Sequence, residues 1–545
     1  MARNKALISL IFVLLSAQGS QAQVNRYVVF FQDKKDSPFS LSDPQEYLSE
    51  RALDRRERFG IPVTEQDLPV NENYVQELSA AGIEAYYRSR WLNAVLVQMN
   101  ESAVIQVEQM ENVKKVVFVA PGERLMHASS NRSGKLPGNF SARKHILLNE
   151  AQNHMLGADL MHADGYTGKN VLIAVFDAGF AGVNESIYFN HLFSGNKIVA
   201  VKDFVRNSGE VYQYDDHGTG VLSTIAGFQE SVYEGMAYDS DVMLCITEDV
   251  PSEYVVEEYN WLFAAEYADS CGVDIINTSL GYNTFDDSSM NHTYGELNGD
   301  STIITQATDL AASKGILCVV SVGNEGNNKW KKLVAPADAD SALAVGAVSQ
   351  DFQYLNFSST GPTADERLKP DVAALGQGTK IIQYDGAVSS GSGTSFASPL
   401  IAGLAAGLWE IYPELNNMEL IGLIRKGGSQ YLNPDTLMGY GVPDYERIKS
   451  LITALDDNLP ASEFSIYPNP VDNKKLIVEY SGNSRDEKIL IDILDIKGSQ
   501  VYELHSGFNS RNTLIELDLS GIQKGIYVMK LFYGSFSMNT KLIIP

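Results

Sequence analysis

Ser395 stands in a glycine-rich turn, residues 391–399, which leads into an alanine-rich apolar run at 400–409 that is typical of a helix. The backbone N–H groups at the start of a helix have no partners within the helix and favour negative charge. A hydroxyl in such a place suits a nucleophile whose attack creates an oxyanion. The segment therefore predicts that Ser395 is a nucleophile.

A serine nucleophile needs a base, and the base needs a carboxylate that orients it. His217 is followed by glycines and an apolar run, a pattern that predicts a helix starting at the imidazole. The other histidines of the chain lack this setting. Taken alone, a His-Gly pair more often caps a helix or lies on the surface, so the assignment of His217 depends on its partners.

Two further residues fit the same chemistry. Asp177 ends the apolar run 171–176, and open α/β sheets build their sites at the carboxyl ends of buried parallel strands. Asn324 lies in a turn after another apolar run, where its side-chain NH₂ can donate to an oxyanion beside the Ser395 amide. Each signal is weak by itself, since an aspartate or asparagine in a turn is common.

The chain divides into units that would position these residues. From 146 to 453, apolar strand-like runs alternate with helical runs, which predicts a parallel sheet covered on both faces. Residues 23–122 mix strand and helix patterns and predict a small α/β module. Residues 464–545 hold short strand-like runs without a helix pattern and predict a β-sandwich. The segments 123–145 and 454–463 are predicted linkers.

The composition narrows the function classes. The 545 residues carry a net charge of −26, which makes the chain a poor candidate for binding nucleic acid. The three cysteines show no metal-ligand spacing and are expected to be buried free thiols. Residues 1–22 combine a basic start, a short apolar core and a small-x-small site, as in a secretory signal peptide. We therefore expect export, with cleavage after Ala22.

Four segments together resemble one family, the subtilases or subtilisin-like serine proteases. They are Asp177-Ala-Gly, His217-Gly-Thr, Gly323-Asn324 and Gly393-Thr-Ser395-Phe-Ala-Ser-Pro399, in the chain order typical of subtilisin. The resemblance implies a three-layer α/β fold with a mostly parallel sheet. It also implies peptide-bond hydrolysis through an acyl-enzyme on Ser395, with His217 as base, Asp177 holding the imidazolium and Asn324 stabilising the oxyanion.

The resemblance assigns further residues. It implies that Ser279, Leu280 and Gly281 add a strand to the bound peptide, and that Ser321, Val322 and Gly323 line the primary pocket. Two positions depart from the family pattern. Gly220 stands where many subtilases have histidine, and Ala178 replaces a hydroxyl residue, which removes one hydrogen bond near Asp177.

No cofactor is assigned by the sequence. Calcium sites are common in the family, and acidic loops occur at Asp286-Asp287 and at 296–300, but neither shows a specific ligand pattern. Calcium therefore stays an open possibility at this point.

The flanking units have resemblances of their own. The order of elements in 23–122, with Leu92-Asn-Ala-Val, resembles a subtilase propeptide. This implies a module that assists folding and inhibits the cleft until self-cleavage within 123–145. The alternative is a permanent accessory domain.

The last unit resembles the C-terminal sorting domain of the type IX secretion system of gram-negative bacteria. The matching residues are Tyr467-Pro-Asn-Pro470, Asp495-Ile-Lys-Gly498, Leu517-Asp-Leu-Ser-Gly521, Gly525-Ile-Tyr527 and Lys541-Leu-Ile. The resemblance implies passage through the outer-membrane secretion machinery, removal of the domain, and release or attachment at the cell surface. The alternative is a carbohydrate- or protein-binding β-sandwich.

Two other functions use the same scaffold. One is a catalytically inactive surface-binding protein, against which the four intact catalytic positions argue. The other is a peptidyl cyclase or ligase, against which the serine nucleophile and the ordinary Asn324 donor argue. We therefore expect a secreted serine endopeptidase, made as a self-processing zymogen that acts on proteins or peptides.

Overall fold

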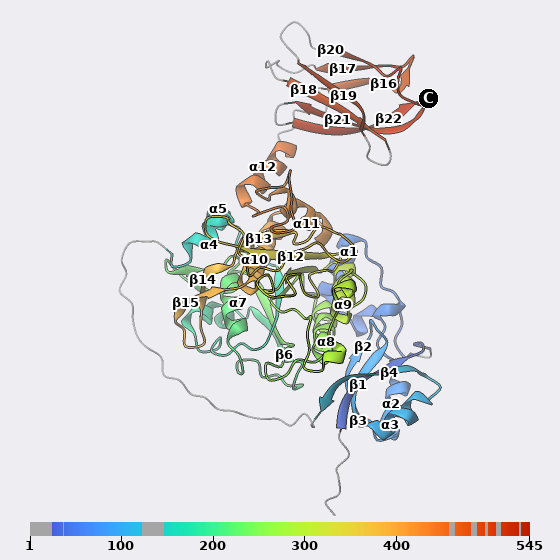
Figure 1. Ribbon diagram of the computed structural model, residues 1–545, viewed down its shortest axis with the longest axis vertical. Helices are drawn as coiled ribbons and strands as arrows, with labels where there is room; N and C mark the ends of the chain where they lie inside the picture. Colours follow the sequence, from blue (N-terminus) through green and yellow to red (C-terminus); the bar gives the residue numbers. More distant parts are fainter. Residues whose placement is uncertain are drawn as a thin grey trace, which may run out of the picture.

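The computed structural model describes residues 24–35, 37–122, 147–456, 464–480, 488–495, 500–507, 514–533 and 536–545. An N-terminal α/β module, a large α/β domain and a C-terminal β-domain follow one another along the chain (Figure 1). The predicted signal peptide and the 123–145 linker lie outside the described residues, as does most of the linker at 454–463.

Seven parallel strands form the central sheet, in the order β13-β12-β11-β10-β5-β9-β6. β5 lies inside the sheet and carries Asp177 at its carboxyl end. The strands are β5 (Leu172–Asp177), β6 (Ile198–Asp203), β9 (Asp241–Ile246), β10 (Ile275–Thr278), β11 (Leu317–Ser321), β12 (Ala342–Val348) and β13 (Val372–Leu375).

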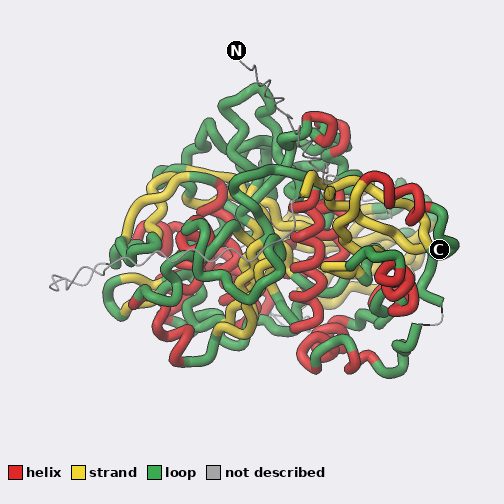
Figure 2. Tube along the Cα trace, turned by 90° about the horizontal axis from the view of Figure 1, so that it is seen from below, coloured by secondary structure: helices red, strands yellow, loops and turns green. Residues whose placement is uncertain are grey.

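Helices cover both faces of this sheet, which explains why its strands are apolar on nearly every residue (Figure 2). Ile173 and Val175 of β5 belong to the core under α7 and α10, whereas Leu172 and Phe176 belong to the core under α8 and α9. The three-layer fold expected from the sequence is confirmed. The long helices are α7 (His217–Ala226), α8 (Val256–Cys271), α9 (Ile303–Ser313), α10 (Thr394–Ile411), α11 (Asn417–Lys426) and α12 (Tyr445–Asp456).

Smaller elements complete the large domain. A hairpin, β14 (Gln377–Ile382) with β15 (Val388–Ser392), leads into α10. The others are α4 (Glu150–Met155), α5 (Ala158–Ala163), α6 (Asn190–Ser194), β7 (Phe228–Gln229), β8 (Tyr233–Glu234) and three 3-10 turns at Ile187–Phe189, Ser288–Met290 and Tyr294–Glu296.

The N-terminal module is an antiparallel sheet with the order β2-β3-β1-β4. One face packs on its own helices α2 and α3, and the other packs against the large domain at α8. The module therefore shares a core with the domain that carries the candidate site. Its elements are β1 (Val24–Phe31), α1 (Glu50–Phe59), α2 (Glu72–Ala80), β2 (Ala85–Ser89), β3 (Ala94–Asn100), α3 (Glu101–Glu108), β4 (Val113–Gly122), and 3-10 turns at Pro44–Glu46 and Glu65–Asp67.

The C-terminal domain consists of two antiparallel sheets with the orders β16-β17-β20 and β19-β18-β21-β22. Alternate residues of both sheets, such as Leu476 and Ile491, meet in one core, as in a β-sandwich. Its strands are β16 (Phe464–Asp472), β17 (Lys475–Tyr480), β18 (Lys488–Leu494), β19 (Gln500–Gly507), β20 (Leu514–Asp518), β21 (Gly525–Tyr533) and β22 (Phe536–Ile544). Within the described parts of the chain, no helix is both long and apolar enough to cross a bilayer.

Candidate active site

Asp177 and His217 form a hydrogen-bonded pair at the carboxyl end of β5. Asp177 is the last residue of the strand and is fully buried. Its Oδ1 accepts the Ala178 backbone N–H at 2.8 Å and lies 2.8 Å from Nδ1 of His217. Because an ionised carboxylate can only accept, Nδ1 carries the imidazole proton and Nε2 is left to act as a base.

Gly218 allows this close approach. α7 begins at His217, whose backbone N–H donates to Asp215 Oδ1 at 2.8 Å. A methyl group at Gly218 would lie 2.4 Å from the Gly179 carbonyl oxygen and 2.9 Å from Cβ of Asp177. Only glycine therefore lets the first turn of α7 pack against the end of β5.

The alanine at position 178 affects the hydrogen bonding of the Asp177 carboxylate. The second carboxylate oxygen, Asp177 Oδ2, is buried and has no hydrogen-bond partner among the described residues. An alanine side chain at 178 supplies no hydroxyl that could donate to it. The carboxylate is thus oriented through Oδ1 alone.

The environment of His217 favours the imidazolium. Burial by itself lowers the pKa of His217, but the charge and hydrogen bond of Asp177, with the charges of Glu248 and Asp215, outweigh burial and raise this pKa from 6.5 to about 9. The side chain remains 32% exposed. The pair can therefore stabilise the imidazolium that forms when His217 takes up a proton as a base.

Ser395 lies in the first turn of α10, because this helix begins at Thr394 and not at residue 400 as expected from the sequence. The preceding Gly393 has a φ of 150°, in a region that favours glycine. Ser395 is half-buried, and the ring of the next residue, Phe396, lies 5.6 Å from the imidazole of His217, centroid to centroid. The start of α10 and the histidine are therefore neighbours in space.

Pro399 explains how the start of α10 is held. A proline has no backbone N–H, so the carbonyl oxygen four residues earlier, that of Ser395, loses its donor within the helix. The hydroxyl of Ser279 donates to this oxygen at 2.8 Å instead. The chain segment after β10 thereby fixes the backbone of the candidate nucleophile.

Asn277 links Ser279 to α10, a role that was not predicted from the sequence. Its Nδ2 donates to Ser279 Oγ at 3.1 Å, and its Oδ1 accepts the Ser398 hydroxyl at 3.0 Å. Asn277 and Ser398 are fully buried. A polar residue inside the apolar strand 275–278 was the signal that could have pointed to this role.

Asn324 is tied to the same helix. Its Oδ1 accepts the Thr394 backbone N–H at 3.0 Å and the Thr394 hydroxyl at 3.2 Å. A methyl group built on Gly393 would lie 3.6 Å from Asn324 Nδ2 and 3.8 Å from the Ser395 amide nitrogen. The two donors expected for an oxyanion therefore flank one point.

The expected substrate-binding residues lie at or directly after the carboxyl ends of β10 and β11, which are adjacent in the sheet. Methyl groups built on Gly281 and Gly323 would lie 2.3 Å and 2.8 Å from Cγ2 of Val334, so the two segments meet around one side chain. Gly281 is exposed and Gly323 is half-buried, whereas the remaining four are buried: Ser279, Leu280, Ser321 and Val322.

Buried ionic contacts hold the N-terminal module on α8. Asp269 accepts hydrogen bonds from Arg55 at 2.6 Å, Arg56 at 2.8 Å and Arg90 at 2.6 Å. Glu266, one turn earlier, accepts the Arg90 backbone N–H at 2.8 Å. Charges this deeply buried require their partners, so these contacts lock the module to the domain.

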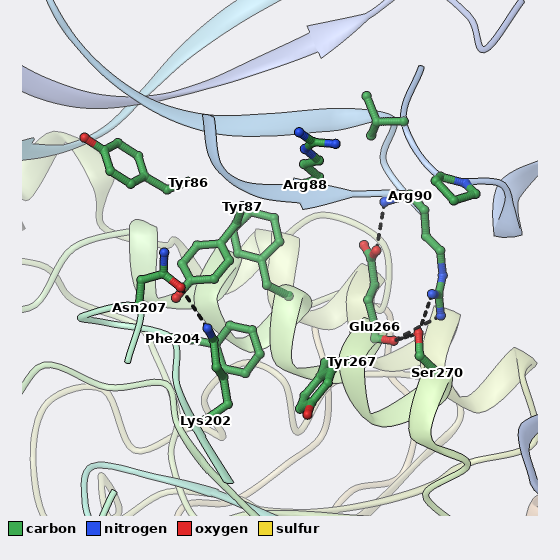
Figure 3. Close-up of a pocket in the computed structure, with 13 residues that line it drawn as sticks. Tyr86, Tyr87, Arg88, Arg90, Lys202, Phe204, Asn207, Glu266, Tyr267 and Ser270 are labelled. Atoms are coloured by element: carbon green, nitrogen blue, oxygen red, sulfur yellow. Dashed lines mark hydrogen bonds between the residues drawn. The ribbon is translucent and has the colours of Figure 1, made fainter. Parts of the chain in front are cut away.

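A cavity of about 490 Å³ lies within this interface, away from the Asp177–His217 pair. Figure 3 shows Tyr87 and Arg90 on the module facing Phe204, Glu266 and Ser270 of the large domain. Because its walls come from both units, the cavity belongs to the interface and adds nothing to the candidate active site.

Residues 168–441, about half of the chain, match the model of the subtilase family. The chain belongs to the subtilase family. Residues 26–134 match a peptidase S8 propeptide domain of Bacteroidota, and residues 465–545 match a secretion system C-terminal sorting domain. The three resemblances seen in the sequence are confirmed, and the protein is a subtilisin-like serine endopeptidase with a propeptide and a sorting domain.

Two sequence relatives agree with this assignment of family. A subtilisin of Bacillus pumilus is 30% identical over 267 residues, which cover 48% of this chain and 85% of that protein. Subtilisin E of Bacillus subtilis is 27% identical over 347 residues, covering 63% and 77%. A crystal structure of MycP1 from Mycobacterium smegmatis is 23% identical, with a TM-score of 0.42 and coverage of 55% and 83%.

Proposed function

We propose that this subtilase is a secreted, self-processing endopeptidase whose triad is Asp177, His217 and Ser395. The observation that carries the proposal is the 2.8 Å contact of buried Asp177 with Nδ1 of His217, beside the helix start that presents Ser395. This contact leaves Nε2 of His217 as the base for a serine.

Each residue of the triad has its own role in the reaction. Ser395 Oγ attacks the carbonyl carbon of the scissile peptide bond while Nε2 of His217 takes the hydroxyl proton. The imidazolium then gives this proton to the leaving amine, and the C–N bond breaks. An acyl-enzyme on Ser395 remains, which water hydrolyses with His217 as base. Asp177 steadies the imidazolium in both steps.

Asn324 Nδ2 and the Ser395 amide would donate to the oxyanion of each tetrahedral intermediate. Support comes from the fixed amide oxygen of Asn324, which Thr394 holds so that the NH₂ group remains for a ligand. The backbone after β10 would pair with the peptide as an added strand, and residues 321–323 at the end of β11 would line the primary pocket.

The propeptide, residues 24–122, would inhibit the enzyme until Ser395 cuts the chain within 123–145. Its sheet and helix α1 pack on the large domain, and the buried arginines at Asp269 make release difficult while the chain is intact. A signal peptide at 1–22 and the C-terminal domain would take the protein through type IX secretion to the surface of a Bacteroidota cell or to the medium.

Following the mass of the chain over time tests self-processing. We expect the wild type to lose its N-terminal residues as far as the 123–145 linker and to digest casein, while Ser395→Ala stays full-length and inert. If both chains are processed alike, cleavage by Ser395 is wrong. A wild type that is inert towards every peptide would favour the inactive, surface-binding alternative.

The secretion proposal has a separate test. Deletion of residues 464–545 is expected to leave an active protease inside the cell envelope, because the C-terminal domain has its own core. Full-length Ser395→Ala should still reach the surface or medium. Appearance of the truncated protein outside the cell would contradict the role of the domain.

A further inference from the structure

Three carboxylates outside the triad gather where β9 is joined to α8. Glu248, Glu253 and Glu257 each place one carboxylate oxygen within 4.8 Å of those of the other two. We call these three residues the glutamate cluster. It contains oxygen ligands only, from residues of the connection and of the first turn of α8, so no ligand motif was visible in the sequence.

Glu257 sets this cluster apart from an acidic surface. Its side chain is 1% exposed, and neither carboxylate oxygen has a hydrogen-bond partner among the described residues. The hydroxyl of Tyr282 is also buried without a partner among the described residues, and burial, with the charges of the cluster, raises the pKa of that tyrosine. Buried carboxylates normally pair or coordinate a metal, so the oxygens of Glu257 suit a cation.

Two arginines near the cluster form their hydrogen bonds with other groups. Burial and neighbouring acids raise the pKa of Glu248 to about 8 and that of Glu257 to about 10. Arg206 is engaged by Asp249 at 2.7 Å. Arg26 of the propeptide interacts electrostatically with Glu257, but its guanidinium donates its hydrogen bond to the Pro121 carbonyl.

The connection that carries the cluster is held by its own hydrogen bonds. The Ser252 backbone N–H donates to the Asp249 carbonyl at 2.8 Å. Glu253 N–H donates to Asp286 Oδ2 at 3.2 Å, and Asp286 N–H returns a bond to the Glu253 carbonyl at 2.9 Å. Glu257 lies in the first turn of α8. The three carboxylates therefore converge because the backbone holds them there.

We propose that the glutamate cluster binds one divalent cation of the calcium type. Calcium takes oxygen ligands at about 2.3–2.6 Å, so two oxygens on one ion lie at most about 5 Å apart, which the 4.8 Å spacing meets. The ion would clamp the connection after β9 to the start of α8. Because the charge of Glu248 reaches His217, the clamp adjoins the candidate triad.

Asp287 and Glu296, in the acidic loops considered from the sequence, accept local backbone hydrogen bonds. Asp287 caps a 3-10 turn through the Ser289 N–H at 2.9 Å, and Glu296 accepts the Thr293 N–H at 2.7 Å. Asp300 lies on an exposed loop. Asp300→Asn therefore serves as a control that removes the same charge as Glu257→Gln.

The test uses the full chain with Ser395→Ala, which does not process itself under the proposed function, after removal of metals by a chelator. Calorimetry is expected to show one equivalent of calcium bound, and calcium should raise the melting temperature by several degrees. Glu257→Gln should weaken binding at least about tenfold, and Glu253→Gln should weaken it as well. Asp300→Asn should bind like the parent.

Terbium luminescence locates the ion. Terbium emission excited through tyrosine should appear when terbium binds and should disappear when calcium displaces it. Tyr282→Phe should reduce this emission without changing the affinity for calcium. Absence of saturable calcium binding would overturn the proposal, as would unchanged binding in Glu257→Gln. A mature protease that binds no calcium but needs Glu257 to cut beside lysine or arginine would assign the cluster to substrate instead. Because the chain tested is inactive, failure here is separate from failure of the protease proposal.

Discussion

The hydroxyl of Ser279 donates to the carbonyl oxygen of Ser395 at 2.8 Å, where Pro399 leaves that oxygen without a helical donor. One side chain after β10 thus replaces a hydrogen bond that the helix cannot form. The position of the candidate nucleophile depends on this contact as well as on α10.

Ser279→Ala should therefore lower kcat about fivefold, the effect of losing one ordinary hydrogen bond of about 1 kcal/mol. The KM should change little, because the backbone proposed to pair with substrate is retained. Steady-state kinetics on a peptide substrate measure both. Ser398→Ala, which removes only the outer bond to Asn277, should have a smaller effect, and an unchanged kcat in Ser279→Ala would contradict the positioning role.

The pair of His217 and Asp177 predicts opposite effects of pH on activity and stability. Burial lowers the His217 pKa and Asp177 raises it more, to about 9. Since the base must be neutral, kcat/KM should rise between about pH 7 and 9. Because the folded pKa exceeds the ordinary 6.5, the stability supplied by the pair is complete below that pH and is lost as the pH rises through about 9.

These two profiles are measured as kcat/KM and as the melting temperature against pH. The Ser395→Ala chain supplies the melting curves without self-digestion, and adding His217→Ala should flatten the change of melting temperature over this range. A kcat/KM that is already constant from pH 7 would show that the imidazole is neutral there.

Asn324 should act on turnover and little on binding. Removing its Nδ2 in Asn324→Ala should lower kcat by about 10²–10³, the loss seen when the oxyanion asparagine of subtilisin is removed. Thr394→Val keeps the backbone N–H that holds Asn324 Oδ1 and is the matched control, with a small expected change. A comparable loss in both variants would show that Asn324 mainly supports the start of α10.

The stability of the zymogen should depend on Arg55 of the propeptide, which is completely buried against Asp269. In the Ser395→Ala chain, Arg55→Ala should destabilise the zymogen by about 3 kcal/mol, because it leaves Asp269 with one partner fewer. Arg58→Ala, on the exposed side of the same helix α1, should be nearly neutral. Equal melting temperatures for the two variants would contradict a locked interface.

Much of the central fold could be predicted because its signals are local. β5 is apolar on every residue before Asp177. The sequence therefore predicted both a buried strand and a site residue at its carboxyl end. The helix α10 was expected only from residue 400, since proline usually stands near a helix start, yet it begins at Thr394 with Pro399 inside it. The hydrogen bond from Ser279 that compensates for this proline is non-local and cannot be predicted from the segment itself.

Other features were missed for related reasons. The helix α2, Glu72–Ala80, is short, although Asn71 caps it through the Asn73 N–H at 2.9 Å, a signal that was available. The glutamate cluster depends on how the connection after β9 turns into α8, which the spacing of Glu248, Glu253 and Glu257 does not encode. The arginines of α1 indicated an amphipathic helix, but their burial against Asp269 required the packed interface.

Labelling with a fluorophosphonate tests the central claim most directly, because this reagent reacts with an activated serine. Mature protein should gain one adduct, and peptide mass mapping should place it on Ser395. The adduct should be absent in Ser395→Ala and strongly reduced in His217→Ala, since Nε2 must take the proton. No adduct on the processed wild type, or an adduct on another residue, would contradict the assignment of Ser395 as the nucleophile.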